Sequence, residues 1–119
     1  MENEIKNFED LKIWQEGVDL AVTTYSLFKD SKDWGFRDQI QRSSVSIPSN
    51  IAEGFDRNSN NEFIRFLNIS KGSCGELRTQ LIIAERVGLI ENAGDLIEQT
   101  RKESKMIQKM ITYRESLRI

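Results

Sequence analysis

The sequence predicts an all-α protein: an up-down-up-down antiparallel four-helix bundle, formed by a single domain over residues 1–119. Apolar residues recur three, four and seven positions apart in four separate stretches, which is the spacing of one helix face. The segments between these stretches are short, and short connections favour antiparallel neighbours. The alternating pattern of β-strands is absent, and 119 residues suffice for one core.

The first helix is expected to begin after Asn7, a residue type that caps helix N-termini well. Its apolar residues repeat at threes and fours, and they are Phe8, Leu11, Trp14, Val18, Ala21, Tyr25 and Phe28. Ile13, Leu20 and Leu27 form a second row, spaced by sevens, which broadens the apolar face beyond one seam. Two interpretations remain open for this row: additional core, or an interface between the subunits of an oligomer.

The second helix is expected over about Phe36–Asp56 and contains the only proline of the chain. Pro48 has no N–H, so the carbonyl of Ser44 loses its helical partner, and a kink is predicted there. Nearby hydroxyls are suited to bond the freed carbonyls, and they belong to Ser43, Ser44, Ser46 and Ser49. A locally repaired kink is favoured over a catalytic serine, because the chain has no histidine to act as the adjacent base.

The third helix is expected to begin with a capping box, in which the Ser59 side chain bonds the Glu62 N–H and the Glu62 side chain returns the bond. It runs to Val87, and Gly88 is predicted to end it in the left-handed conformation. Asn92 is expected to cap the fourth helix. The predicted apolar face of that helix is formed by Leu96, Ile97, Thr100, Ser104, Ile107, Met110, Ile111 and Leu117.

A fold-back of the second and third helices at Arg57 and Asn58 determines which residues face each other. Gly72 and Gly75 then lie opposite the serines that precede Pro48. Small side chains let two backbones approach, so this glycine pair is predicted to mark a close contact between the helices.

The same register places Arg42 near Glu76, and Glu53 near Arg65. These glutamates are therefore interpreted as structural ion-pair partners rather than as general acids. Asn50 is the most ambiguous residue in this region. Bonding to the carbonyls of the kink is the favoured interpretation, and a polar ligand site is the alternative.

The composition argues against several kinds of chemistry. With no histidine and a single cysteine, Cys74, the chain cannot build a structural zinc site, and no metal, cofactor or small-molecule substrate is predicted. Met1–Glu4 lacks the basic start of a signal peptide, and no apolar run is long enough to span a bilayer. A cytoplasmic location without a membrane partner is therefore expected.

The net charge of −2 argues against a surface that attracts nucleic acid everywhere. Lys102, Lys105 and Lys109 nevertheless share one face of the fourth helix, at i, i+3 and i+7. A solvated helix face is the first interpretation of such a stripe, and phosphate contact is the second.

One stretch resembles a known family. Residues Asp38–Arg42, followed by Ser-Ile-Pro-Ser-Asn-Ile-Ala-Glu-Gly at 46–54, are similar to the signature of the 23S rRNA-intervening sequence protein family. Further matches include Phe8–Leu11, Trp14, Phe63 and Phe66. The motif positions singled out in this chain are Arg42, Ser46, Pro48, Asn50, Glu53, Gly54, Gly72, Gly75 and Glu76.

The resemblance implies an all-α bundle that assembles into a homopentamer, and it implies no known reaction. A related branch assists diversity-generating retroelements, where the ring binds nucleic acid and a reverse transcriptase. The expected function is therefore a non-catalytic, oligomeric docking platform for nucleic acid or a protein partner. A purely structural homo-oligomer without nucleic-acid binding is the alternative, and an enzyme ranks last.

Overall fold

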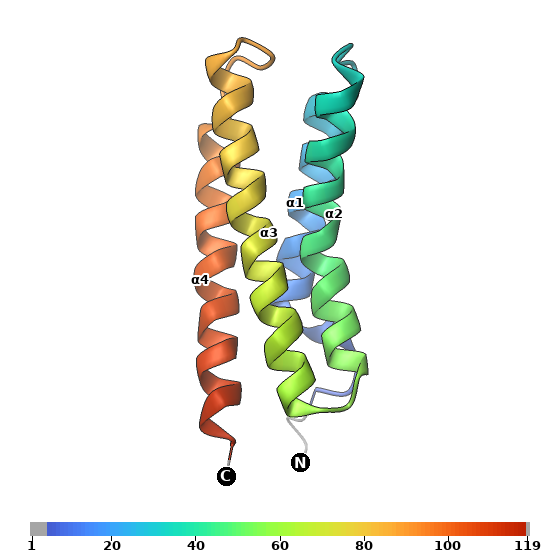
Figure 1. Cartoon of the computed structure of the whole chain (residues 1–119), viewed down its shortest axis with the longest axis vertical. Coiled ribbons are helices and arrows are strands. Elements are labelled where there is room, and N and C mark those ends of the chain that lie inside the picture. The colour runs from blue at the N-terminus through green and yellow to red at the C-terminus, as the bar shows by residue number, and fades with distance from the viewer. Residues whose placement is uncertain (1–4, 119) are drawn as a thin grey trace.

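A computed structural model describes residues 5–118 and confirms the predicted four-helix bundle (Figure 1). The bundle measures 49 × 22 × 20 Å along its principal axes. Each helix packs against its two neighbours in the ring, and within residues 5–118 the backbones of the diagonal pairs stay further apart. The elements are the 3-10 turn η1 (Phe8–Asp10) and the helices α1 (Lys12–Phe28), α2 (Trp34–Asp56), α3 (Asn60–Arg86) and α4 (Gly94–Ser116).

The start of α1 differs from the prediction. Asn7 precedes only the short turn η1, and its side chain makes no capping bond. Leu11 then adopts an extended conformation, with φ −78° and ψ 127°, and its side chain is buried. The helix begins at Lys12 because the chain must bend at Leu11 to place that side chain in the core.

The start of α3 confirms half of the predicted capping box. The Ser59 hydroxyl accepts a hydrogen bond from the Glu62 N–H at 3.3 Å. The Glu62 carboxylate does not return to the backbone of Ser59. It accepts two bonds from the Arg65 guanidinium instead, because the charged partner lies one turn away on the same helix.

The connection between α3 and α4 confirms the predicted helix end and shifts the next cap. Gly88 has φ +81°, and the Leu89 N–H donates to the Ala84 carbonyl at 2.9 Å, which is the Schellman pattern. Asn92 lies one residue before the N-cap position, which Ala93 occupies. The Asn92 side chain accepts from the Gly94 N–H at 2.8 Å and so closes a turn ahead of the helix.

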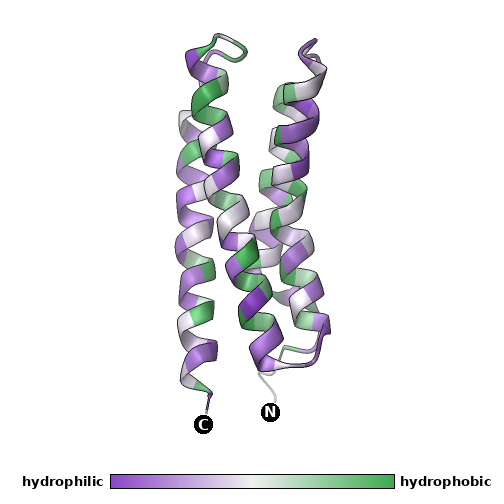
Figure 2. Ribbon diagram, viewed as in Figure 1, coloured by the Kyte–Doolittle hydropathy of each residue, from purple (hydrophilic) through white to green (hydrophobic). Residues whose placement is uncertain are grey.

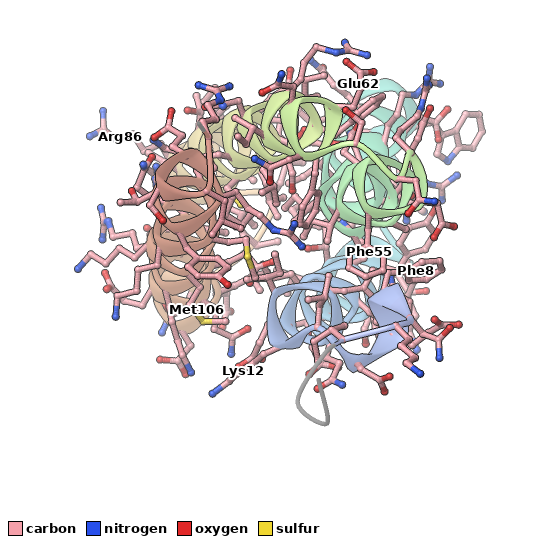
Figure 3. The ribbon with its side chains drawn as sticks, turned by 90° about the horizontal axis from the view of Figure 1, so that it is seen from below. Phe8, Lys12, Phe55, Glu62, Arg86 and Met106 are labelled. Carbon is pink, nitrogen blue, oxygen red and sulfur yellow. The ribbon has the colours of Figure 1, made fainter. Side chains whose placement is uncertain are left out.

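The core runs the whole length of the bundle and is formed by apolar side chains of all four helices. Figure 2 shows hydrophobic residues recurring along every helix, and Figure 3 shows the helices surrounding the central side chains. Ile13 and Leu20 are 4% and 2% exposed, so they belong to this core, whereas Leu27 is 39% exposed. The additional-core interpretation is therefore confirmed for Ile13 and Leu20, and only Leu27 of the row proposed as an oligomer interface is left exposed.

Helix α2 continues through Pro48, and polar side chains bond the carbonyls around it. The Asn50 side-chain amide donates to the Ser46 carbonyl at 2.7 Å. The Ser70 hydroxyl of α3 donates to the Ile47 carbonyl at 2.8 Å, inside the core. Asn50 therefore donates to a carbonyl near the proline, but to that of Ser46 rather than to the Ser44 carbonyl that Pro48 frees. Helix α3 supplies a donor that was not foreseen.

The predicted close contact at Gly72 and Gly75 is wrong. A Cβ atom at Gly72 would meet nothing within 4 Å, and one at Gly75 would meet only an Arg78 nitrogen at 3.9 Å. The helices approach most closely at Gly54, where a Cβ would lie 2.5 Å from the Cβ of Phe66. Both predicted glycines face away from α2, because the register of α3 turns Ser70 and Ser73 toward it.

Within residues 5–118, no helix combines the length and the apolar character that a membrane crossing requires.

Gly54→Ala should destabilise the protein, whereas Gly72→Ala should stabilise it. The new methyl group at residue 54 meets the Cβ of Phe66, which cannot move without its helix, so overpacking of about 1–3 kcal/mol is expected. At residue 72 the methyl group finds open space, and replacing a helical glycine by alanine gains about 0.5–1 kcal/mol. Urea unfolding of both variants measures the difference, and equal effects would refute the close contact at Gly54.

Candidate functional site

The exposed side of α2 holds a shallow groove that gathers most of the motif residues on that helix. Its volume is about 660 Å³, and Tyr25 of α1 closes one side. The α2 residues that line it are Asp38, Gln41, Arg42, Val45, Ser46, Ser49, Asn50 and Glu53. Their spacing of three and four positions places them on one helix face. The groove carries both signs of charge and two exposed hydrophobic side chains, those of Tyr25 and Val45.

The predicted ion pairs across α2 and α3 are not the ones formed. Glu76 accepts a hydrogen bond from the Ser43 hydroxyl at 3.1 Å, in place of an ion pair with Arg42. Glu53 pairs with Arg57 at 2.8 Å, one turn away on α2, in place of Arg65. Arg65 is held by Glu62 at 3.1 Å, and its guanidinium holds the pKa of that carboxyl below its usual value. For Glu53 and Arg65 the bonded partner is on the same helix, one turn away.

The three lysines on α4 are exposed, as a docking face requires. Lys102 lies 3.5 Å from the Glu16 carboxylate of α1, with 63% of its side chain exposed. Lys105 and Lys109 are exposed on the same side of the helix. The ion pairs among residues 5–118 include neither of these two lysines, so their charges are available to a partner.

A buried carboxyl that the sequence did not reveal lies at mid-height of the bundle. Glu103 of α4 is 1% exposed, and neither of its carboxyl oxygens has a hydrogen-bond partner. Gly17 of α1 makes room for it, because a Cβ at Gly17 would lie 3.1 Å from Oε2 of Glu103. The sequence does carry a signal for the burial of Glu103, namely its position three residues after Thr100 and four before Ile107, which are both buried. The predicted apolar face contains the neighbouring Ser104 instead, and the structure leaves Ser104 only partly buried.

The surroundings keep this carboxyl protonated. Burial raises the pKa of Glu103 to about 8, the nearby Glu16 carboxylate raises it further, and Lys102 opposes both. From α3, Cys74 faces the same layer, and burial together with Glu103 raises the pKa of its thiol to about 12, against the effect of Arg78. Cys74 is fully buried, as predicted for a core thiol, and a thiol with so high a pKa is unreactive.

No group of three or more metal-binding side chains forms a cluster in the part of the chain that the structure describes, residues 5–118.

The stability of the protein should fall as pH rises, and Glu103 should carry much of the fall. In the unfolded chain Glu103 loses its proton near the ordinary pKa of 4.5, and in the fold near about 8. Between these values the folded state holds the extra proton, so rising pH favours unfolding. The stability contributed by the protonated group is complete below about pH 4.5 and is lost by pH 8.

Glu103→Gln should therefore gain stability relative to the wild type as pH rises from about 5 to about 8.5, by on the order of a few kcal/mol. Glu98→Gln, an exposed change on the same helix, is the control and should track the wild type. Urea unfolding at several pH values gives the three curves. Parallel curves for the wild type and Glu103→Gln would contradict the assignment.

Comparison with known proteins places this fold in a family. The model of the 23S rRNA-intervening sequence proteins matches residues 9–112. The chain is also similar in structure to a protein of unknown function from the S23 ribosomal protein family of Bacteroides thetaiotaomicron, with a TM-score of 0.77 and 24% identity. That match covers 84% of this chain and 95% of the other. Comparison with curated proteins gave no match. Since the family model spans most of its length, the chain belongs to the 23S rRNA-intervening sequence protein family.

Proposed function

We propose that this chain is a non-catalytic docking protein that self-associates and presents the α4 lysines to the phosphates of a nucleic acid. The observation that carries the proposal is the exposed row Lys102, Lys105 and Lys109. A cytoplasmic location is part of this proposal. A structural homo-oligomer without nucleic-acid binding is the alternative, and an enzyme ranks last.

The case for self-association rests on the surface formed by α1 and α2. Val22, Tyr25 and Val45 are 63%, 47% and 40% exposed. Val22 and Tyr25 are three residues apart on α1, and Tyr25 shares the groove on α2 with Val45. Apolar side chains beside charges of both signs suit contact with another copy of the same surface or with a different face of a second copy. A pentamer is the assembly that the family resemblance suggests.

The case for nucleic acid rests on charge and repetition. Lysines bind phosphates as point charges and position a nucleic acid without reading its sequence. One short row binds weakly, but an oligomer repeats it, and linked weak contacts gain from a high effective concentration. The Glu16 carboxylate beside Lys102 weakens the row at one end, so Lys105 and Lys109 are expected to contribute more.

Light scattering at micromolar concentration should give the mass of an oligomer, with five copies as the expected number. Val45→Glu should shift the mass toward the monomer, because it places a charge in the proposed contact. Ile83→Glu makes the same change at another exposed apolar residue and serves as the control. A monomer mass for the wild type would contradict self-association, and equal effects of both variants would contradict the α1–α2 surface.

Structured RNA and duplex DNA should bind the wild type at low salt, with an affinity that falls steeply as salt rises. Each phosphate contact adds roughly 0.9 to the slope of log affinity against log salt for duplex DNA. A triple change of Lys102, Lys105 and Lys109 to Glu should abolish binding in a gel-shift titration.

The matched control for this experiment changes Lys29, Lys32 and Arg86 to Glu. These residues are exposed near the connections that follow α1 and α3, at one end of the bundle, and the change in charge is the same. It should bind nearly as well as the wild type. Equal loss in both triple variants would indicate a general charge effect, and absence of binding by the wild type would leave the structural homo-oligomer as the function.

A further inference from the structure

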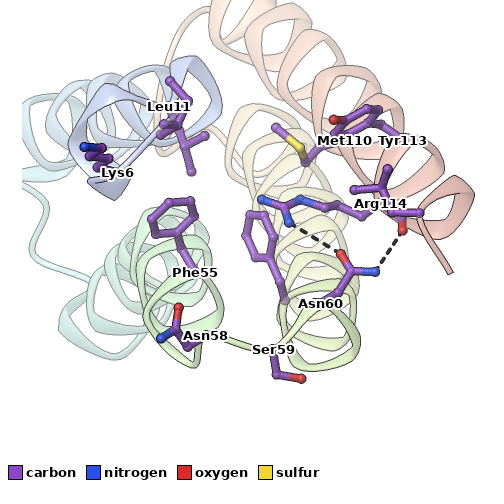
Figure 4. A pocket seen from close by; sticks show the side chains of 12 residues that line it. Lys6, Leu11, Phe55, Asn58, Ser59, Asn60, Met110, Tyr113 and Arg114 are labelled. Carbon is purple, nitrogen blue, oxygen red and sulfur yellow. Dashed lines mark hydrogen bonds between the residues drawn. The ribbon is translucent and has the colours of Figure 1, made fainter. Parts of the chain in front are cut away.

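A second cavity lies at the end of the bundle where the N-terminal segment meets α2, α3 and α4 (Figure 4). Its volume is about 650 Å³, which is in the range of small-molecule sites. The apolar part of its wall is formed by Ile5, Leu11, Phe55, Phe63, Met110 and Leu117. The polar part is formed by Lys6, Asn58, Ser59, Asn60, Tyr113 and Arg114. This end pocket is separate from the groove on α2 and from the α4 lysines.

Arg114 is held in a fixed orientation at this pocket. Its Nη1 donates to the Asn60 side-chain oxygen at 3.4 Å, and the Asn60 amide donates to the Arg114 carbonyl at 2.9 Å (Figure 4). The guanidinium also lies over the Phe63 ring, 4.8 Å from its centroid. These contacts restrain a long side chain before any ligand arrives, so less entropy is lost on binding.

One donor of this guanidinium is left without a partner. The Nε atom of Arg114 is buried and makes no hydrogen bond. A buried N–H without a partner is costly, so an acceptor placed beside it would be favoured. Nε and Nη2 form the edge of a guanidinium that a carboxylate accepts with two parallel bonds. Met110 lines the same pocket, and its flexible thioether side chain can shift to admit such a group.

The charge of the pocket points to an anion. Of the twelve lining residues that belong to the described part of the chain, 5–118, Lys6 and Arg114 are basic and none is acidic. The N-terminus of α3 begins at Asn60 in the same wall, and a helix N-terminus adds a partial positive charge. A small, fully hydrated anion would lose bonds to water against the aromatic and aliphatic side chains of the facing wall and gain no polar contact there. They fit a ligand with an apolar body next to its charged group.

We propose that the end pocket binds a small carboxylate with an apolar body, the carboxylate on the Nε–Nη2 edge of Arg114 and the body against Phe55, Phe63 and Met110. This site is independent of the proposed docking function. An oligomer that binds no nucleic acid would still contain it.

The test is a titration of the full chain with 4-phenylbutyrate, followed by calorimetry and by NMR of the Met110 methyl group and the phenylalanine rings. The neutral alcohol 4-phenylbutanol and inorganic phosphate are the comparison ligands. The carboxylate should bind at least about tenfold more tightly than either comparison ligand. The alcohol lacks the charged group that bonds Arg114, and phosphate lacks the apolar body that contacts the phenylalanine rings. Binding of the alcohol or of phosphate as tight as that of the carboxylate would overturn the proposal.

Arg114→Gln should weaken carboxylate binding about tenfold or more and leave binding of the alcohol unchanged. Arg101→Gln is the matched control, because it removes the same charge from an exposed position more than about three turns away on the same helix. Thermal melting shows whether each variant is folded. If Arg114→Gln does not fold, the ligand comparison on the wild type decides alone. No shift of the Met110 methyl on binding, or equal weakening by both variants, would overturn the site.

Discussion

The contact between α2 and α3 depends on small and hydroxylated side chains, and the rest of the bundle is arranged around it. Gly54 has no side chain where Phe66 crosses, so the two backbones come close at one end. Further along, Ser46 donates to the Ser73 hydroxyl at 2.6 Å, and Ser70 reaches the Ile47 carbonyl. The second of these bonds places a donor from α3 on the carbonyl that directly precedes the proline, inside the core. Helix α2 thus keeps its place in the core although it contains a proline.

The other two helices pack onto this pair in different ways. Gly17 brings α1 against Ile47 and Pro48, at 3.3 and 3.4 Å from the position that a Cβ would take. Helix α4 fills the remaining side, and there the chain places Glu103 rather than an apolar residue. The proline, the glycine and the carboxyl thus share one layer of the bundle. A neutral carboxyl is compatible with that layer, and a charged one is not.

Local patterns predicted the helices and several of their ends, because a helix face and a cap are properties of a few neighbouring residues. Ser59 and Gly88 behave as their residue types require. Local patterns could not predict which glycines lie at close helix contacts, because the roles of Gly17, Gly54 and Gly72 depend on which residues of another helix pack beside them. Ile13 and Leu20 were ambiguous for the same reason: burial is decided by all four helices together. The burial of Glu103 was not predicted, because a carboxylate is rarely found in a core. The end pocket joins residues from both ends of the sequence, so no local pattern could have revealed it.

The seam between α1 and α4 is the one contact of the ring whose two helices are not consecutive in the chain, and it is also where Glu103 lies. Separation of this seam breaks no loop and leaves the α2–α3 contact intact. The seam is therefore the natural place for a partial opening, in which α1 would also leave α2 while the α2–α3 and α3–α4 contacts persist. In hydrogen-exchange terms, the amides of α1 would exchange through a partial opening that becomes more frequent as the carboxyl ionises. The amides of α3, which packs against both α2 and α4, would exchange only through unfolding of the whole domain.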